Sequence, residues 1–214
     1  MKYKNKSIKI SCDGGAATGK STAAKLIAKK YNLAFLSSGL LYRYASYLII
    51  KYKPKNEVVF LKKKFKVLNY KKLSKINLHT PKISEHTTKI AKILKIRNIL
   101  KKFQREFFKK NKGCVLEGRD ASTKILPNSD IKFFFICDLK VAAKRRFNDL
   151  KKYSKKISYK EVKIALYKRN QADKSRSISP LQKHPDAVVV STSKMSKQEM
   201  LKIMSKYVEK VLLK

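Results

Sequence analysis

The chain of 214 residues is predicted to have an α/β fold, in which a parallel sheet is covered by helices on both faces. Apolar runs of strand length alternate with segments of helical composition. The length suits one domain, and the longest apolar runs are too short to cross a membrane. A glycine-rich stretch lies between the first strand and the first helix, as is common where such sheets bind ligands.

Five strands and five main helices are expected in order along the chain. Strand signals lie at 8–12, 33–36, 114–117, 131–137 and 187–191. Helical patterns lie at 20–30, 39–51, 85–109, 141–152 and 196–213. Two stretches interrupt this alternation: the lysine-rich residues 52–84, and residues 153–185, which contain a further helix at 159–173. We expect both stretches to be lobes inserted into a single domain, residues 1–214, and to close over substrates.

The stretch from Gly14 to Ser21 matches every required position of G-x-x-x-x-G-K-[ST]. In such a loop, backbone N–H groups at a helix N-terminus bind the phosphates of a nucleoside triphosphate, the Lys reaches the β- and γ-phosphates, and the Ser ligates Mg²⁺. We expect phosphate binding by Gly14, Gly15, Ala16, Ala17, Thr18, Gly19, Lys20, Ser21 and Thr22. Lys20 is then a catalytic residue and Ser21 the metal ligand. The fold class is therefore a three-layer P-loop fold with a five-stranded parallel sheet.

The formal net charge of +40 raises the question of a nucleic-acid or membrane partner. However, 46 of the 54 basic residues are lysines spread over the whole chain, which is typical of a solvated surface or of AT-rich coding. We expect the charge to speed encounters with anionic substrates, with no obligate nucleic acid and no membrane. No apolar signal core precedes the first strand, so a cytoplasmic location is expected. Cys12, Cys114 and Cys137 are scattered and are expected to be reduced core residues.

Arginine is rare in this chain, so each arginine is a candidate for planar, bidentate binding of an anion. The eight are Arg43, Arg97, Arg105, Arg119, Arg145, Arg146, Arg169 and Arg176. Arg43 and Arg119 both follow the ends of predicted strands, as does the glycine-rich loop. Since parallel sheets bind ligands at the carboxyl ends of their strands, we expect these groups to share one cleft.

Six segments of the chain, in order and spacing, resemble bacterial cytidylate kinases, which are nucleoside-monophosphate kinases. The segments are the loop at 13–22, Leu36-Ser37-Ser38-Gly39-Leu40-Leu41-Tyr42-Arg43, Thr80-Pro81-Lys82-Ile83-Ser84, Gln104-Arg105, Glu117-Gly118-Arg119-Asp120 and the run at 169–181. The resemblance implies transfer of the γ-phosphoryl group of ATP to CMP or dCMP with Mg²⁺. Two alternatives stay open: another small-acceptor kinase, for uridylate, adenylate or shikimate, and a basic nucleic-acid-binding protein.

The resemblance also implies roles for individual residues. The acceptor phosphate would be held by Ser38, Arg43, Arg119 and Arg176, the cytosine edge by Thr88, Arg97 and Asp120, and the ribose by Arg169 and Asp173. Phosphoryl transfer needs positioning and charge neutralisation. The expected catalytic set is Lys20, Arg119, Arg145, Arg146, Arg169 and Arg176. The lobe at about 52–84 would bind the monophosphate, and the lobe at about 153–185 would be a lid. The sequence does not give the oligomeric state, and a monomer is the default expectation.

The sequence departs from the family pattern at a few positions. Ser37 and Glu117 stand where the family has Asp, so either Asp13 or Glu117 could organise Mg²⁺. Ala17 and Ser122 stand where glycine is usual. We expect these changes to affect binding strength and not the class of reaction.

Overall fold

The computed structural model describes residues 7–152 and 157–213. The chain divides into two compact units: Met1–Leu36 with Lys112–Lys214, and Ser37–Asn111. The basic N-terminal residues 1–6 and the first four residues of the expected lid, 153–156, lie outside the described residues. Within the two described ranges, no helix combines the length and apolar character needed to span a bilayer.

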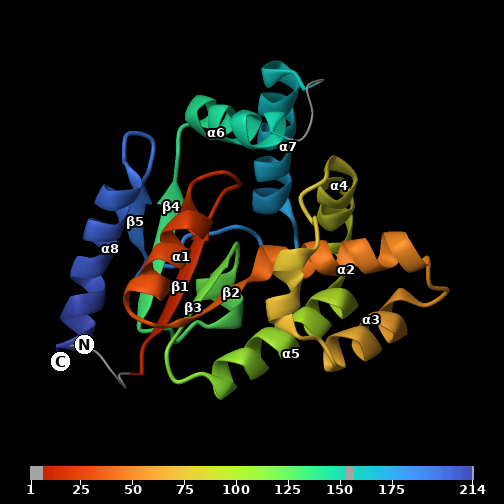
Figure 1. Cartoon of the computed structure of the whole chain (residues 1–214), viewed down its shortest axis with the longest axis horizontal. Helices are drawn as coiled ribbons and strands as arrows, with labels where there is room; N and C mark the ends of the chain where they lie inside the picture. The colour runs from red at the N-terminus through yellow and green to blue at the C-terminus, as the bar shows by residue number, and fades with distance from the viewer. Residues whose placement is uncertain (1–6, 153–156, 214) are drawn as a thin grey trace. The chain divides into compact units, whose positions relative to one another are not determined.

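The first unit is built on a sheet of five strands, counted over the described residues, in the order β2-β3-β1-β4-β5 (Figure 1). The strands are β1 (Lys9–Gly14), β2 (Ala34–Ser37), β3 (Cys114–Gly118), β4 (Ile131–Ile136) and β5 (Val188–Ser191). The central strand β1 pairs in parallel with β3 and β4, so that Ile10 lies opposite Val115 and Ile131. Each strand lies within two residues of its predicted range, and the predicted five-stranded parallel α/β fold is confirmed.

One face of the sheet packs against α1 (Lys20–Lys30) and α8 (Lys197–Leu212). Ile10 of β1 and Phe133 of β4 are fully buried there against Ile27 of α1 and Met204 of α8. Because side chains alternate along a strand, Asp13 points to the opposite face. On that face lies the short π-helical turn η2 (Ala121–Ile125), which Asp13 contacts.

The cysteines behave as apolar core residues where they lie in the sheet. Cys12 of β1 and Cys114 of β3 are buried free thiols. Burial raises the pKa of the Cys114 thiol to about 12, so it stays protonated at neutral pH. Cys137, just after β4, is half-buried.

Two helices, α6 (Leu139–Lys151) and α7 (Tyr159–Ser175), pack against each other beyond the carboxyl end of β4 (Figure 1). Asp138 caps α6, and Ser158 with Glu161 forms a capping box at the start of α7. Ala143 and Leu166 form a small apolar cluster with Ala16 of the glycine-rich loop. This cluster packs α7 against the glycine-rich loop.

The second unit is helical. It contains α2 (Ser38–Tyr52), α3 (Glu57–Lys66), the 3-10 helix η1 (Tyr70–Lys75), α4 (Pro81–Ile90) and α5 (Leu94–Lys110). The expected lobe at 52–84 lies within this larger unit, which also includes α2 and α5. Its helix α3 begins at an Asn56 cap whose side chain accepts the Val59 N–H. An Asn before a helix is a recognised start signal, but the lysine-rich composition of residues 52–84 hid this helix from the sequence analysis.

The expectation of one continuous helix over 85–109 is wrong. The chain forms α4 and α5, separated by Ala91–Lys92–Ile93. The N–H groups of Lys92 and Ile93 turn back to the carbonyls of Lys89 and Ile90, which ends α4. The Arg97 guanidinium then donates to the Ala91 carbonyl, at 3.0 Å, and stabilises this break. The helical pattern of the sequence continues through the break, so local helix propensity does not predict it.

Candidate active site

The glycine-rich loop joins β1 to α1, and its backbone accounts for its glycines. Gly19, just before α1, has a φ of 80°, in the left-handed region that favours glycine. At Gly14, a Cβ would collide with the Phe135 carbonyl of β4. Ala17 has a φ of 59°, which costs an L residue about 1 kcal/mol or more, so a glycine there is the less strained choice.

Lys20 is the first residue of α1, and its amine is buried against β3. Its Nζ lies 3.4 Å from Oε2 of Glu117 and 3.4 Å from the Gly15 carbonyl oxygen. Burial and repulsion from Arg119 lower the pKa of Lys20 to about 8, while Glu117 opposes this shift. Glu117 lies near the end of β3, opposite Cys12 of β1, and so the sheet itself brings the two groups together.

Asp13 is fully buried, and its carboxylate forms hydrogen bonds within the protein. Its carboxylate accepts hydrogen bonds from the backbone N–H groups of Ala121 and Ser122, both at 2.7 Å, and from the Ser122 hydroxyl at 2.6 Å. Burial raises the pKa of Asp13, and these hydrogen bonds oppose that rise. Ser122, where glycine is usual in the family pattern, therefore adds a bond to Asp13. Asp13 holds the turn η2, directly after Asp120, in place.

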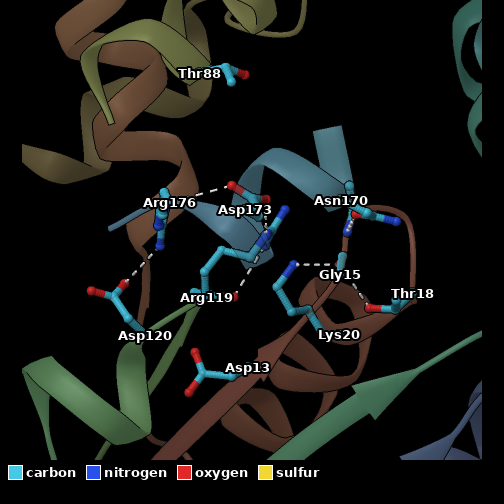
Figure 2. Close-up of polar contacts among 12 residues, drawn as sticks. Asp13, Gly15, Thr18, Lys20, Thr88, Arg119, Asp120, Asn170, Asp173 and Arg176 are labelled. Carbon is cyan, nitrogen blue, oxygen red and sulfur yellow. Dashed lines mark hydrogen bonds and ion pairs between the residues drawn. The ribbon is translucent and has the colours of Figure 1, made fainter. Parts of the chain in front are cut away.

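An ion-pair network joins the end of β3 to the end of α7 (Figure 2). The Arg119 Nε donates to Oδ2 of Asp173 at 2.9 Å, and a nitrogen of Arg176 lies 3.5 Å from Oδ1 of Asp173. Another nitrogen of Arg176 lies 4.0 Å from Oδ1 of Asp120. Burial raises the pKa of Asp173, but Arg119, Arg169 and Arg176 together hold it below its usual value. Asp173 thus stays ionised and orients two arginines.

Arg169 and Asn170 lie on α7 one turn before Asp173. Burial and repulsion from Arg119 lower the pKa of Arg169 to about 10, so it stays charged at pH 7. Arg146 of α6 also acts on Arg169 electrostatically. Asn170 accepts the Ala16 N–H, at 2.9 Å, and connects α7 to the glycine-rich loop.

A cavity of about 540 Å³ opens beside the loop. Its walls come from the loop, the start of α1, α6 and the start of α8, and include Ala17, Thr18, Gly19, Lys20, Ser21, Thr22, Arg145, Asp149, Met195, Ser196, Lys197 and Met200. The Arg145 guanidinium donates to the Thr192 carbonyl at 2.7 Å and to its hydroxyl at 3.2 Å. Arg145 thus lies in the cavity wall, held by Thr192.

Four expected site residues lie in the second unit. Ser38 is the buried first residue of α2, whose cap is Ser37, accepting the Leu40 N–H at 3.2 Å. Arg43 donates to the Leu78 carbonyl and the Ser84 hydroxyl at 3.0 and 2.8 Å. The Thr88 hydroxyl donates to the Ser84 carbonyl at 3.3 Å. Arg97 stacks on the Tyr42 ring at 5.5 Å. These contacts order the helices that carry the four residues.

The structure brings most of the expected residues together within the first unit. Lys20, Arg119, Asp120, Arg169, Asp173 and Arg176 form one cluster around the ends of β3 and α7. Sequence reasoning missed Asn170 and Thr192, which contact the loop. Asn170 lies inside the matched run at 169–181, so its place next to Arg169 was a usable signal. Thr192 follows β5 without any motif.

A parallel sheet with a G-x-x-x-x-G-K-S loop and a cluster of arginines beyond its strand ends defines the class of P-loop kinases. In fold, the chain is similar to an uncharacterized protein from Eubacterium ventriosum, with a TM-score of 0.55 and 16% identity over 94% of this chain and 98% of that chain. It is also similar to TT1252 from Thermus thermophilus, with a TM-score of 0.52 and 16% identity over 97% and 99%.

The sequence comparisons identify the family. The cytidylate kinase family model matches residues 10–210. The cytidylate kinase of Clostridium tetani is 31% identical over 96% of this chain and 95% of its own length. That of Thermosipho melanesiensis is 33% identical over 94% and 96%. The chain belongs to the cytidylate kinase family, as the six matched segments predict.

Proposed function

We propose that this enzyme transfers the γ-phosphoryl group of ATP to CMP or dCMP, giving ADP and CDP or dCDP. One observation carries this proposal: the loop lysine and the arginine network meet at the end of β3. Lys20 lies 3.4 Å from Glu117, and Arg119, two residues further on, pairs with Asp173 at 2.9 Å beside Lys20 (Figure 2). A triphosphate on the loop would therefore have its terminal phosphate next to guanidinium groups suited to a second phosphate.

On the donor side, the N–H groups of the loop and the start of α1 bind the phosphates, and the cavity beside them takes the nucleoside. Arg145 lies in the wall of this cavity, so we assign it to the donor nucleotide, and we keep Arg146 as the candidate for the migrating phosphoryl group. Lys20 is held by Glu117 and Gly15 in the free enzyme, and we expect it to turn to the phosphates when they arrive.

The residues present fit a Mg²⁺ ion bound with the triphosphate. Ser21 is one of the residues that line the cavity, and the Glu117 carboxylate is paired with Lys20. Asp13 is fully engaged with η2, so of the two acidic candidates we assign Glu117. When bound, Mg²⁺ would neutralise charge on the β- and γ-phosphates.

On the acceptor side, Arg119 and Arg176 hold the monophosphate, and Asp173 keeps them oriented. An ionised oxygen of the acceptor phosphate attacks the γ-phosphorus in line, and the bond to the bridging oxygen of ADP breaks. No general base is needed, because this oxygen carries no proton at neutral pH. We also propose that Ser38, Arg43, Thr88 and Arg97 bind the acceptor nucleotide, and that the lobes at about 52–84 and about 153–185 close over the substrates. A cytoplasmic monomer is the expected working form.

The proposal is tested by a coupled assay of ADP release with ATP and a panel of acceptors: CMP, dCMP, UMP, AMP and shikimate. We expect kcat/KM for CMP or dCMP to exceed that for the other acceptors by about tenfold or more, because a wrong base leaves buried polar groups unpaired. Lys20→Ala is the control for contaminating kinases and should reduce turnover by about 100-fold or more. A higher kcat/KM for UMP, AMP or shikimate would contradict the proposal and show that the enzyme acts on a different acceptor.

A further inference from the structure

The side chain of Asn170 provides a contact between α7 and the phosphate-binding loop. Its Oδ1 accepts the N–H of Ala16 at 2.9 Å, across 154 positions of the sequence. Figure 2 shows that the Asn170 side chain points from α7 toward the loop, beside Gly15 and Thr18. Ala16 itself is buried, so without Asn170 its N–H would lack this partner.

Gly15 makes room for Asn170. The motif does not require glycine at this position. A Cβ on Gly15 would lie 3.2 Å from Oδ1 and 3.5 Å from Cγ of Asn170, and 3.4 Å from Cγ2 of Thr18. The first of these distances is tighter than ordinary van der Waals contact, so a methyl group would push the amide away from the loop. Two successive loop residues, Gly15 and Ala16, therefore contact the Asn170 side chain closely.

The choice of an amide fits the position. The Ala16 N–H is a donor, so the oxygen of the amide faces it and the NH₂ group keeps two donors of its own. An amide accepts the loop N–H without placing a negative charge beside the phosphates. On α7, Asn170 lies between Arg169 and Asp173. One turn of α7 thus carries both the loop contact and the residues of the arginine network.

We propose that Asn170 is a positioning residue for the donor phosphates: through Ala16 and Gly15 it holds the loop in the shape that presents its backbone N–H groups to a triphosphate. It acts through the loop and is not itself a catalytic residue. The proposal rests on the proposed function only in naming ATP as the triphosphate.

The first test compares Asn170→Leu, which keeps similar size and loses the acceptor, with Gln171→Leu on the same helix. Gln171 is exposed and bonds Tyr167, away from the loop. Isothermal titration measures ATP and CMP binding separately. We expect Asn170→Leu to weaken ATP binding about three- to tenfold, the value of one hydrogen bond, with CMP binding unchanged. Gln171→Leu should bind both ligands like the wild type.

The second test is a double-variant cycle of Gly15→Ala and Asn170→Ala, which also serves if the leucine variant fails to fold. Gly15→Ala should weaken ATP binding in the wild type, and by less than half that factor when Asn170 is already Ala, because the methyl group then has space. Kinetically, the KM for ATP should rise more than kcat falls.

Either of two results would overturn the inference: ATP binding by Asn170→Leu equal to that of the wild type, or strictly additive effects in the cycle. If the wild type itself failed to bind ATP, the proposed function would fail instead. The titrations need no turnover, so the two failures are distinguishable.

Discussion

Individual arginines in this lysine-rich chain have two different uses. Arg119 and Arg176 share the carboxylate of Asp173, at the position where an acceptor phosphate is proposed. Arg43 and Arg97 bind backbone carbonyls and order the helical unit. Both uses exploit the flat, multiply donating guanidinium group, which lysine lacks. The rarity of arginine therefore marks positions with demanding geometry, and the structure distinguishes their partners.

The first prediction concerns the charge of Lys20. Its pKa is lowered to about 8 in the free enzyme, so the amine is protonated below pH 8 and neutral above it. Because the charged form attracts the phosphates, kcat/KM for ATP should fall about tenfold per pH unit above pH 8. Lys20→Arg, which stays charged, should show lower activity and no such fall. A flat wild-type profile up to pH 9.5 would contradict the assignment.

The second prediction concerns the base preference. If Asp120 accepts the amino group of cytosine, Asp120→Asn should reduce the ratio of kcat/KM for CMP over UMP about tenfold, since an amide also donates to the uracil carbonyl. Asp186→Asn removes the same charge from a side chain that is 75% exposed and is the matched control. An unchanged ratio in Asp120→Asn would move the base contact elsewhere.

At the scale of elements, a few long-range hydrogen bonds position the turn η2 and the helix α7, which carry site residues. The turn η2 follows Asp120 directly and is tied to β1 by the three hydrogen bonds of Asp13. The helix α7 is tied to the loop by Asn170 and to β3 by the pair of Asp173 with Arg119. Each contact crosses more than 50 residues of sequence, so the strands β1 and β3 act as the common frame.

The third prediction concerns Asp13 and η2. Asp13→Ala leaves two backbone N–H groups and a hydroxyl without their buried acceptor, and should lower the free energy of unfolding by about 2 to 5 kcal/mol. Ser122→Ala removes one of the three bonds and should cost about 1 kcal/mol. Urea unfolding measures both. Equal stability of Asp13→Ala and the wild type would show that these bonds do not hold the turn.

At the scale of the whole molecule, the dominant property is the net charge of +40. Phosphoryl donors and acceptors are anions, so long-range attraction should raise their encounter rates. The same charge also attracts any nucleic acid without regard to sequence. The rival class, a dedicated nucleic-acid-binding protein, is separated from the kinase by how each activity responds to salt.

The fourth prediction is that salt lowers the rate of substrate binding and leaves the rate of phosphoryl transfer nearly unchanged. Raising KCl from about 50 to about 300 mM should lower kcat/KM for CMP several-fold through screening and change kcat by less than about twofold. Binding of oligo(U) and a mixed-sequence RNA, measured by anisotropy in the same buffers, should decline steeply and equally. RNA binding that persists at high salt with a sequence preference would favour the rival class.

The sequence predicted the elements that have strong local signals. The strands are continuous apolar runs, α1 matches its predicted range, and the loop motif is local by nature. The break between α4 and α5 was missed because the helical pattern continues through it, and its contacts, such as that of Arg97 with Ala91, appear only in the folded chain. Asn170 was missed as a loop contact because one amide in a polar helix carries no periodic signal until the helix is packed.

The sequence by itself determined the α/β class, the family and the residues available for phosphate chemistry, since these depend on spacing along the chain. Only the tertiary structure decided how those residues are used: Asp13 serves η2, Glu117 pairs with Lys20, and Asp173 orients two arginines. The physical reason is that a buried carboxylate must find donors, and which donors lie within about 3 Å depends on the packing of distant segments.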